Sequence, residues 1–179
     1  MSYTNFEIEN LLKTINIIVD SREHPGKQFD ERVKSFGCAW ERRKLDQGDY
    51  SYKYTDLDGR EISMDKRLII ERKMNLNEIA NNFGRERQRF IREFERAKAE
   101  NTQVYILIED DSWEDAYKGT YGKDARHRSK YSAKAMIGSL TAWEHRYNAR
   151  IRFCKKSRSG QMIKDICHYH LKEILENEG

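Results

Sequence analysis

Three short apolar runs constrain the fold of this chain more than any other feature of its sequence. They are INIIVD (residues 15–20), RLIIE (67–71) and VYILIE (104–109). Each run is rich in β-branched residues, too short for a helix and too continuously apolar for a strand with one face in water. We therefore expect three central strands that are covered on both faces.

Segments with helical periodicity lie between these apolar runs and after them. One more strand is expected near the end of the chain. The sequence therefore predicts an α/β fold of three layers, in which a central mixed sheet is flanked by helices. The expected helices cover residues 27–36, 76–99, 132–147 and 159–175, and the late strand covers 150–154.

A β-hairpin is predicted in the first half of the chain. YSYKY (50–54) alternates aromatic and polar residues, and REISM (60–64) resumes a strand pattern. Between them, the dipeptide Asp58-Gly59 is a strong signal for a two-residue hairpin turn.

This hairpin has a consequence for two distant carboxylates. With a two-residue turn, Asp49 is expected to face Leu68, three positions before Glu71. A bulge at the polar step Asp65-Lys66 would close that gap. The hairpin is therefore predicted to bring Asp49 and Glu71 to the same end of one pair of strands.

The overall composition excludes some environments but selects no partner. The 179 residues include 34 Lys and Arg against 30 Asp and Glu, so the net charge of +4 is only mildly basic. Three cysteines without a CxxC spacing, and no N-terminal signal sequence, indicate an intracellular protein with reduced thiols. No apolar run approaches the roughly 20 residues of a membrane helix, so no membrane association is expected.

The residues around Asp49 and Glu71 meet the requirements of phosphodiester cleavage. That reaction needs a divalent cation, an activated water, and a cation or proton donor near the reacting oxygens. Mg²⁺ prefers oxygen ligands, and Asp49 and Glu71 supply two carboxylates. Lys73 is expected on the same strand face as Glu71, since side chains alternate along a strand. Asp20 adds a third carboxylate at the end of the first strand.

Three sequence blocks occur in order: VDSRE (19–23), GDY (48–50) and ERKMNLNE (71–78). They resemble the XPF-type structure-specific endonuclease family, whose nuclease domain carries V-D-x-R-E, then G-D-Y/F, then E-R-K-x-x-x-D. The resemblance covers roughly residues 15–175. It implies a restriction-endonuclease-like fold and a metal-dependent DNA endonuclease that acts at branched or flap-like DNA. The compact form resembles members encoded by bacteriophages and mobile elements, which implies the cytoplasm of a bacterial host, or the nucleus for a eukaryotic source.

The resemblance also implies roles for individual residues. Asp20, Asp49 and Glu71 would hold Mg²⁺, or Mn²⁺ in its place, together with the backbone carbonyl of Arg72. Lys73 would be the catalytic lysine that positions or helps to deprotonate the attacking water. The implied catalytic set thus contains Asp20, Asp49, Glu71 and Lys73, with Arg22, Glu23 and Arg72 as supporting site residues.

Two features depart from the family pattern. Asn77 occupies the place of the final Asp of the E-R-K-x-x-x-D motif. Asp and Asn both cap helices, and a helix is expected to begin near Leu76, so we expect Asn77 to act as a cap. A tandem helix-hairpin-helix module is not expected: residues 1–14 are predicted to be an extension, and 15–179 a single nuclease domain.

Two regions are candidates for DNA contacts. Residues 118–134 are rich in cations and interleaved with aromatic residues, which suits phosphates and unpaired bases, although a solvated loop would read the same way. Arg87 lies on the apolar stripe of the 76–99 helix, where it would need an acidic or phosphate partner. Alternatively, Gly84 breaks that helix and leaves Arg87 exposed. The DNA-binding candidates are Arg87, Lys118, Lys123, Arg126, Arg128 and Lys130.

The resemblance implies a homodimer formed through the C-terminal helices. The apolar stripe of residues 159–175 is also explained by packing within one chain. Two other functions stay open from the sequence. One is a non-catalytic DNA-binding or scaffolding paralogue. The other is a sequence-specific restriction or recombination nuclease on the same core.

Overall fold

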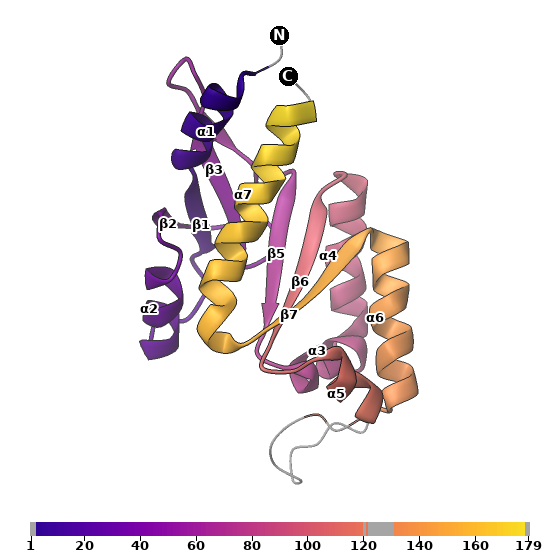
Figure 1. Cartoon of the computed structure of the whole chain (residues 1–179). Coiled ribbons are helices and arrows are strands. Elements are labelled where there is room, and N and C mark those ends of the chain that lie inside the picture. Colours follow the sequence, from indigo (N-terminus) through magenta and orange to yellow (C-terminus); the bar gives the residue numbers. More distant parts are fainter. Residues whose placement is uncertain (1–2, 120, 122–130, 178–179) are drawn as a thin grey trace. The chain divides into compact units, whose positions relative to one another are not determined.

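The structure is a computed structural model that describes residues 3–119, 121 and 131–177 (Figure 1). These residues form a seven-stranded mixed sheet with the hydrogen-bonded order β2-β1-β3-β5-β6-β7, and β4 pairs with β3. The predicted α/β class, a mixed sheet flanked by helices, is confirmed. The strands are β1 (Asn16–Asp20), β2 (Ala39–Arg43), β3 (Tyr50–Thr55), β4 (Glu61–Ser63), β5 (Leu68–Lys73), β6 (Gln103–Glu109) and β7 (Ala149–Cys154).

The chain divides into two compact units. The first unit comprises Met1–Ile69 and Ser157–Gly179, and the second comprises Ile70–Lys156. Across the described residues, every helix is too short or too polar to cross a membrane. The helices of the first unit are α1 (Asn5–Lys13), α2 (Lys27–Lys34) and α7 (Ser159–Asn177); those of the second are α3 (Leu76–Phe83), α4 (Arg87–Ala99), α5 (Trp113–Lys118) and α6 (Ala133–Tyr147).

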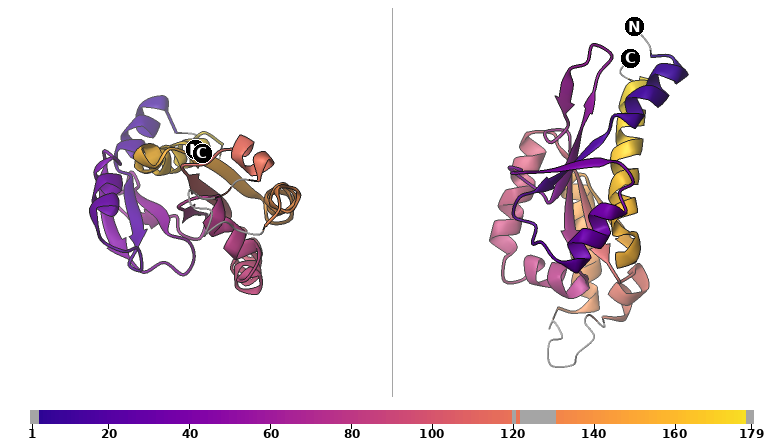
Figure 2. Two further views of the ribbon diagram at one scale, coloured as in Figure 1. Left: turned by 90° about the horizontal axis from the view of Figure 1, so that it is seen from below. Right: turned by 90° about the vertical axis from the view of Figure 1, so that its left-hand side faces the viewer.

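In the first unit, β1 is the centre of the sheet. It pairs in parallel with β2 and antiparallel with β3, and its residues Ile17, Ile18 and Val19 are fully buried. Helices α1 and α7 both pack against β3, and α2 packs against α7. Figure 2 shows α7, in yellow, running beside α1 in this unit. The apolar run INIIVD is thus covered as its sequence predicts.

The apolar stripe of α7 is used inside the first unit. Its residues Ile163, Cys167 and Leu171 are fully buried, since α1, α2 and β3 cover them. The interpretation of this stripe as packing is therefore confirmed. Helix α1 places Ile8 and Leu11 in the same core, so residues 5–13 contribute to the packing of this unit.

The hairpin between β3 and β4 forms, but with a wider turn than the sequence suggests. Its register pairs Lys53 with Ser63 and Thr55 with Glu61, so the two-residue turn at Asp58-Gly59 is wrong. The carboxylate of Asp56 accepts hydrogen bonds from the backbone N–H groups of Asp58 and Arg60, which closes the longer loop. A side-chain acceptor has replaced the tight backbone turn.

The chain also turns, rather than bulges, between β4 and β5. The carbonyl of Met64 accepts hydrogen bonds from the N–H groups of Arg67 and Leu68, and β5 begins only at Leu68. The hydroxyl of Ser51 donates to the carbonyl of Leu68 at 2.8 Å. Because β4 ends at Ser63 and a turn precedes β5, the continuous hairpin register that was expected to place Asp49 opposite Leu68 is not formed.

In the second unit, β6 pairs in parallel with β7, α4 packs on β6 and α6 packs on β7. Gly84 ends α3 and α4 starts at Arg87, so the alternative in which Gly84 breaks the helix over 76–99 is confirmed. Asn75, and not Asn77, caps α3: its side chain accepts the N–H of Glu78 at 3.0 Å. Aromatic residues of α3, α4 and α6 form the core of this layer: Phe83, Phe90, Phe94, Trp143 and Tyr147.

Candidate active site

Asp20 ends β1 with a carboxylate that is almost fully enclosed by donors. Its Oδ1 accepts the backbone N–H and the Nε–H of Arg22, both at 2.7 Å. Its Oδ2 accepts Nη2–H of Arg22 at 3.0 Å and the N–H of Leu45 at 2.7 Å. Because Asp20 is only 1% exposed, these four hydrogen bonds fix the chain after β1 and the segment that leads to the GDY block.

This environment sets the acidity of Asp20. Burial alone would raise the pKa of the carboxyl group, but the hydrogen bonds from Arg22 and Leu45 outweigh it and lower the pKa below its ordinary value. The ionised form is therefore the form that the fold stabilises. That stabilisation is present above the unfolded pKa of about 3.9 and is lost as the pH falls through the lower folded pKa.

Replacing Asp20 by Asn is expected to destabilise the protein at neutral pH by about 2 kcal/mol. The NH₂ group of the amide would face the N–H donors of Arg22 or Leu45, so those hydrogen bonds would be lost. Thermal unfolding of both proteins between pH 7 and pH 3 measures this effect. The difference in Tm is expected to shrink as the wild-type carboxylate becomes protonated. An Asp58→Asn protein, altered on the exposed turn, is the matched control and is expected to keep the wild-type Tm; a pH-independent loss for Asp20→Asn would contradict this assignment.

Asp49 lies next to Asp20 in the first unit. The carbonyl of Asp49 accepts the N–H of Asp20 at 2.8 Å, just before β3 begins at Tyr50. The Asp49 side chain is half-buried. The VDSRE and GDY blocks, which are 25 residues or more apart in sequence, are thus joined by a main-chain hydrogen bond.

Glu23, the last residue of the VDSRE block, contacts Tyr50 of the GDY block and an arginine that lies outside the three blocks. Its Oε2 accepts the hydroxyl of Tyr50 at 2.7 Å and Nη1–H of Arg32 at 3.3 Å. Arg32 lies on α2 and is buried. In the sequence Arg32 stands in the highly charged segment KQFDERVK, where nothing local distinguishes it from its exposed neighbours.

In the second unit, Glu71 and Lys73 form a close pair at the end of β5. Lys73 Nζ lies 2.7 Å from Glu71 Oε1 and 3.8 Å from Glu78 Oε1. The ammonium group also lies 5.5 Å from the centre of the Phe90 ring, and Lys73 is 6% exposed. The alternation of strand side chains thus gives Glu71 and Lys73 the common face that their spacing predicts.

Arg72, between them, makes a different contact. Its Nη1 lies 3.2 Å from Oε2 of Glu109, which ends β6 and is fully buried. Asp111, just beyond, accepts the N–H of Leu76 at 2.6 Å, and burial raises the pKa of its carboxyl group. The end of β5 and the start of α3 are therefore anchored to the end of β6.

Asp49 and Glu71, the carboxylates expected from the sequence to hold a metal ion, have the chemistry that a hard divalent cation requires. Among the described residues, no group of three or more His, Cys, Asp or Glu side chains forms a ready-made metal cluster. Mg²⁺ does not require one, since it usually binds through one or two carboxylates and keeps several waters. Asp49 and Glu71 are carboxylates of the kind that such an ion uses.

Of the six DNA-binding candidates, Arg87 and Lys118 lie within the described residues. Arg87 is half-buried: its guanidinium lies 5.3 Å from the centre of the Trp143 ring, and Nη1–H donates to the Phe83 carbonyl at 3.3 Å. The break at Gly84 accounts for this position. Lys118 is exposed at the end of α5. The other four candidates lie outside the described residues: Lys123, Arg126, Arg128 and Lys130.

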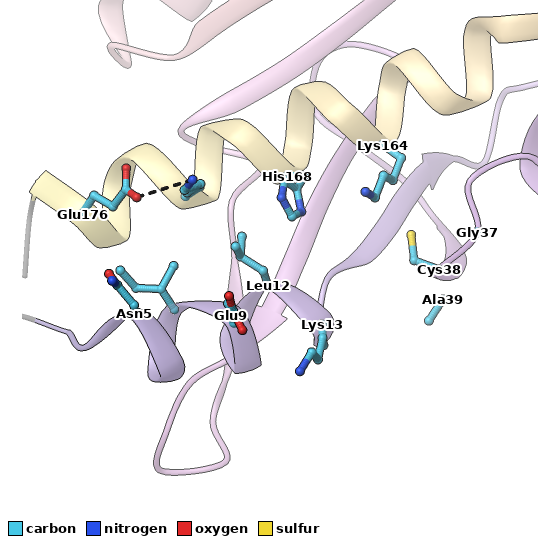
Figure 3. A pocket seen from close by; sticks show the side chains of 12 residues that line it. Asn5, Glu9, Leu12, Lys13, Gly37, Cys38, Ala39, Lys164, His168 and Glu176 are labelled. Atoms are coloured by element: carbon cyan, nitrogen blue, oxygen red, sulfur yellow. Dashed lines mark ion pairs between the residues drawn. The ribbon is translucent and has the colours of Figure 1, made fainter.

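A separate pocket of about 800 Å³ lies in the first unit between α1, α7 and the start of β2. Figure 3 shows Lys164 and His168 of α7 on one side and Leu12 of α1 on the other. Burial and the neighbouring lysines Lys164 and Lys172 lower the pKa of His168. None of the residues of the three motif blocks lines this pocket.

These features are those of a restriction-endonuclease-like α/β fold, with acidic residues at strand ends in each unit and a lysine at the end of β5 in the second. The family model of the ERCC4 domain matches residues 19–166, so the chain belongs to the ERCC4 domain family. The resemblance to XPF-type nucleases is confirmed. Family membership and fold together support a DNA nuclease.

Solved structures show the same fold. The chain is 17% identical to XPF from Aeropyrum pernix, with a TM-score of 0.59 over 86% of this chain and 65% of that one. For XPF from Aeropyrum pernix in complex with DNA, the identity is 17% and the TM-score 0.58, over 88% of this chain and 66% of that one. The chain thus spans slightly less than two thirds of these relatives. No curated protein matches its sequence.

Proposed function

We propose that this chain is a divalent-metal-dependent DNA endonuclease that cuts branched or flap-like DNA. The observation that carries the proposal is the pair of Glu71 and Lys73, with 2.7 Å between Oε1 and Nζ, at the buried end of β5. A carboxylate and an ammonium side by side supply a cation ligand and a positive charge for the reacting phosphate.

The cation would be held by Asp49 and Glu71, and it would neutralise charge on the phosphate and lower the pKa of a bound water. Asp20, also expected as a ligand, already accepts four hydrogen bonds. We propose that its larger role is to hold the turn after β1 beside Asp49. Mn²⁺ shares the preference for oxygen ligands and is expected to substitute for Mg²⁺.

Lys73 would orient the attacking water and stabilise the charge that develops on the phosphate oxygens. Its ammonium group is enclosed by Glu71, Glu78 and the face of Phe90, so its position is fixed before substrate binds. A preorganised charge in a site shielded from water stabilises a transition state more than a mobile one does. Cleavage is expected to leave a 5′ phosphate and a 3′ hydroxyl.

Basic residues on β7 extend the candidate DNA-binding surface. Arg150 and Arg152 are exposed, and their guanidinium carbons lie 5.6 and 5.4 Å from the centre of the Tyr105 ring. Nη1–H of Arg150 also donates to the Tyr105 hydroxyl at 3.0 Å. Two guanidinium groups held on one ring suit a phosphate backbone, which supports DNA as the partner.

We also propose a homodimer formed through the C-terminal helices, on the basis of the resemblance to the XPF-type family alone. The buried stripe of α7 is used within the first unit, so pairing through α7 would use outer residues such as Tyr169, which is 60% exposed.

One assay tests the proposed function. Purified protein is incubated with duplex, flap, splayed-arm and single-stranded DNA of several sequences, with Mg²⁺, Mn²⁺ or EDTA. Cleavage near the branch, independent of sequence and abolished by EDTA, is the expected result. Cleavage at a fixed sequence would instead indicate a restriction-type enzyme. Binding without cleavage under every condition would indicate a scaffolding paralogue and would overturn the proposal.

A further inference from the structure

Among the described residues outside the three motif blocks, Arg32 is the most deeply buried arginine. It lies in the last turn of α2, and it is 5% exposed. Its guanidinium group donates to three side chains: Nη1–H to Tyr50 Oη at 3.0 Å and to Glu23 Oε2 at 3.3 Å, and Nε–H to Ser159 Oγ at 3.3 Å. A buried cation with three partners fixes the relative positions of the segments that carry them.

Two of those partners belong to the motif blocks. Glu23 ends VDSRE, Tyr50 ends GDY, and the Tyr50 hydroxyl also donates to Glu23 at 2.7 Å. The three side chains therefore form a closed triangle. The main-chain bond from Asp20 N–H to the Asp49 carbonyl joins the same two blocks a few residues away.

The third partner anchors the triangle from outside. Ser159 starts α7, and Gly160 follows at a position where α7 and α2 are in close contact. A Cβ atom at position 160 would overlap Ser35 Oγ and the carbonyl of Arg32. The backbone of α7 thus lies directly on the last turn of α2, which restricts the direction in which Arg32 leaves the helix.

We propose that Arg32 is a positioning residue of the nuclease, and that Glu23 acts on the site through it. The geometry makes Arg32, Glu23 and Tyr50 a brace that holds Asp49 in place for cation binding. This inference rests on the proposed nuclease function. It assigns a role to a residue outside the family motifs, and it makes Glu23 a support for Asp49 and not a group that contacts the substrate.

Replacing Arg32 by Met tests the brace. The single-turnover cleavage rate of folded protein is expected to fall about 10- to 100-fold, because a small displacement of a catalytic group has effects of that size. DNA affinity, measured by fluorescence anisotropy in EDTA, is expected to stay unchanged, since the brace does not contact DNA. A purely structural role would lower Tm and leave the rate of the folded fraction unchanged, which would overturn the proposal.

A double-mutant cycle separates a brace from a catalytic Glu23. If Glu23 acts through Arg32, the cleavage rate of Glu23→Gln/Arg32→Met is expected to equal that of the slower single variant. If Glu23 contacts the reacting groups itself, the two losses will multiply, and the second half of the proposal is overturned.

A pair of tyrosines on β3 provides a milder, matched test that applies even where Arg32→Met does not fold. Tyr50→Phe removes one corner of the triangle but keeps the contact between Arg32 and Glu23, so a loss of about threefold is expected. Tyr52→Phe is the control: Tyr52 is equally buried in the same strand, and its hydroxyl lies 2.7 Å from His170 Nδ1 on α7.

Equal cleavage rates for Tyr50→Phe and Tyr52→Phe would overturn the brace. A wild-type protein that cuts DNA while Arg32→Met cuts equally fast would overturn it too, and would leave the nuclease function standing. A wild-type protein that cuts no DNA would overturn the function and the brace with it.

Discussion

Replacing Lys73 by Met is expected to reduce the single-turnover rate of DNA cleavage by about 100- to 1,000-fold, the usual effect of removing one preorganised charge from a reaction centre. Lys73 Nζ is 2.7 Å from Glu71 Oε1, and Lys73 is 6% exposed, so water replaces it poorly. Met keeps most of the volume and the contact with Phe90 while removing the charge.

The loss is expected in the rate and not in DNA binding, since a group that acts mainly in the transition state changes kcat more than KM. Fluorescence anisotropy with a flap substrate in EDTA measures binding, and rapid quench in Mg²⁺ measures cleavage. Lys66→Met is the control, because Lys66 is 57% exposed and pairs with Asp46 on the surface. Folded Lys73→Met protein that cuts at the wild-type rate would remove Lys73 from the mechanism.

The strand at residues 68–73 and the shared face of Glu71 and Lys73 could be predicted from the sequence because both depend on local structure. Leu68, Ile69 and Ile70 are buried as a continuous apolar run predicts for a central strand. Glu71 and Lys73 are two residues apart on that strand, so their common face follows from the strand period alone. Whether Glu71 and Lys73 share a face depends only on the strand geometry of three consecutive residues, so it can be predicted from the sequence.

The errors arise where a side chain competes with the backbone. Asp56 closes the hairpin loop by accepting two backbone N–H groups, and this overrides the turn signal of Asp58-Gly59. At α3, Asn75 takes the cap that we expected from Asn77, while Asp111 holds the N–H of Leu76. The Asp111 contact crosses 35 positions, so no local pattern in the sequence contains it.

Arg32 was missed for the same reason on a larger scale. Its partner Ser159 is 127 positions away, and the contact depends on the close approach of α7 at Gly160. Read alone, KQFDERVK is a highly charged helix in which one more arginine suggests a solvated face. Only the packing of α2 on α7 distinguishes the buried cation from its exposed neighbours.

The binding of a divalent cation can be tested without DNA. Mg²⁺ at about ten times its dissociation constant is expected to raise the Tm of the wild-type protein by about 3–5 °C, because binding to the folded state alone adds about 1.4 kcal/mol. Asp49→Asn and Glu71→Gln are each expected to abolish this shift, since each removes one of the two proposed ligands. Asp46→Asn, which alters a surface carboxylate paired with Lys66, is the control that should keep it.

The same titration decides the role of Asp20. If Asp20 positions the chain beside Asp49, Asp20→Asn will start from a lower Tm but still respond to Mg²⁺ at higher concentration. If Asp20 is a ligand, its response will vanish as for Asp49→Asn. The two proposed ligands come from β-strand ends in different units, so a shift lost in only one of Asp49→Asn and Glu71→Gln would show that they do not share an ion. Loss of the shift in both, with cleavage lost in parallel, is the result that the two-carboxylate site requires.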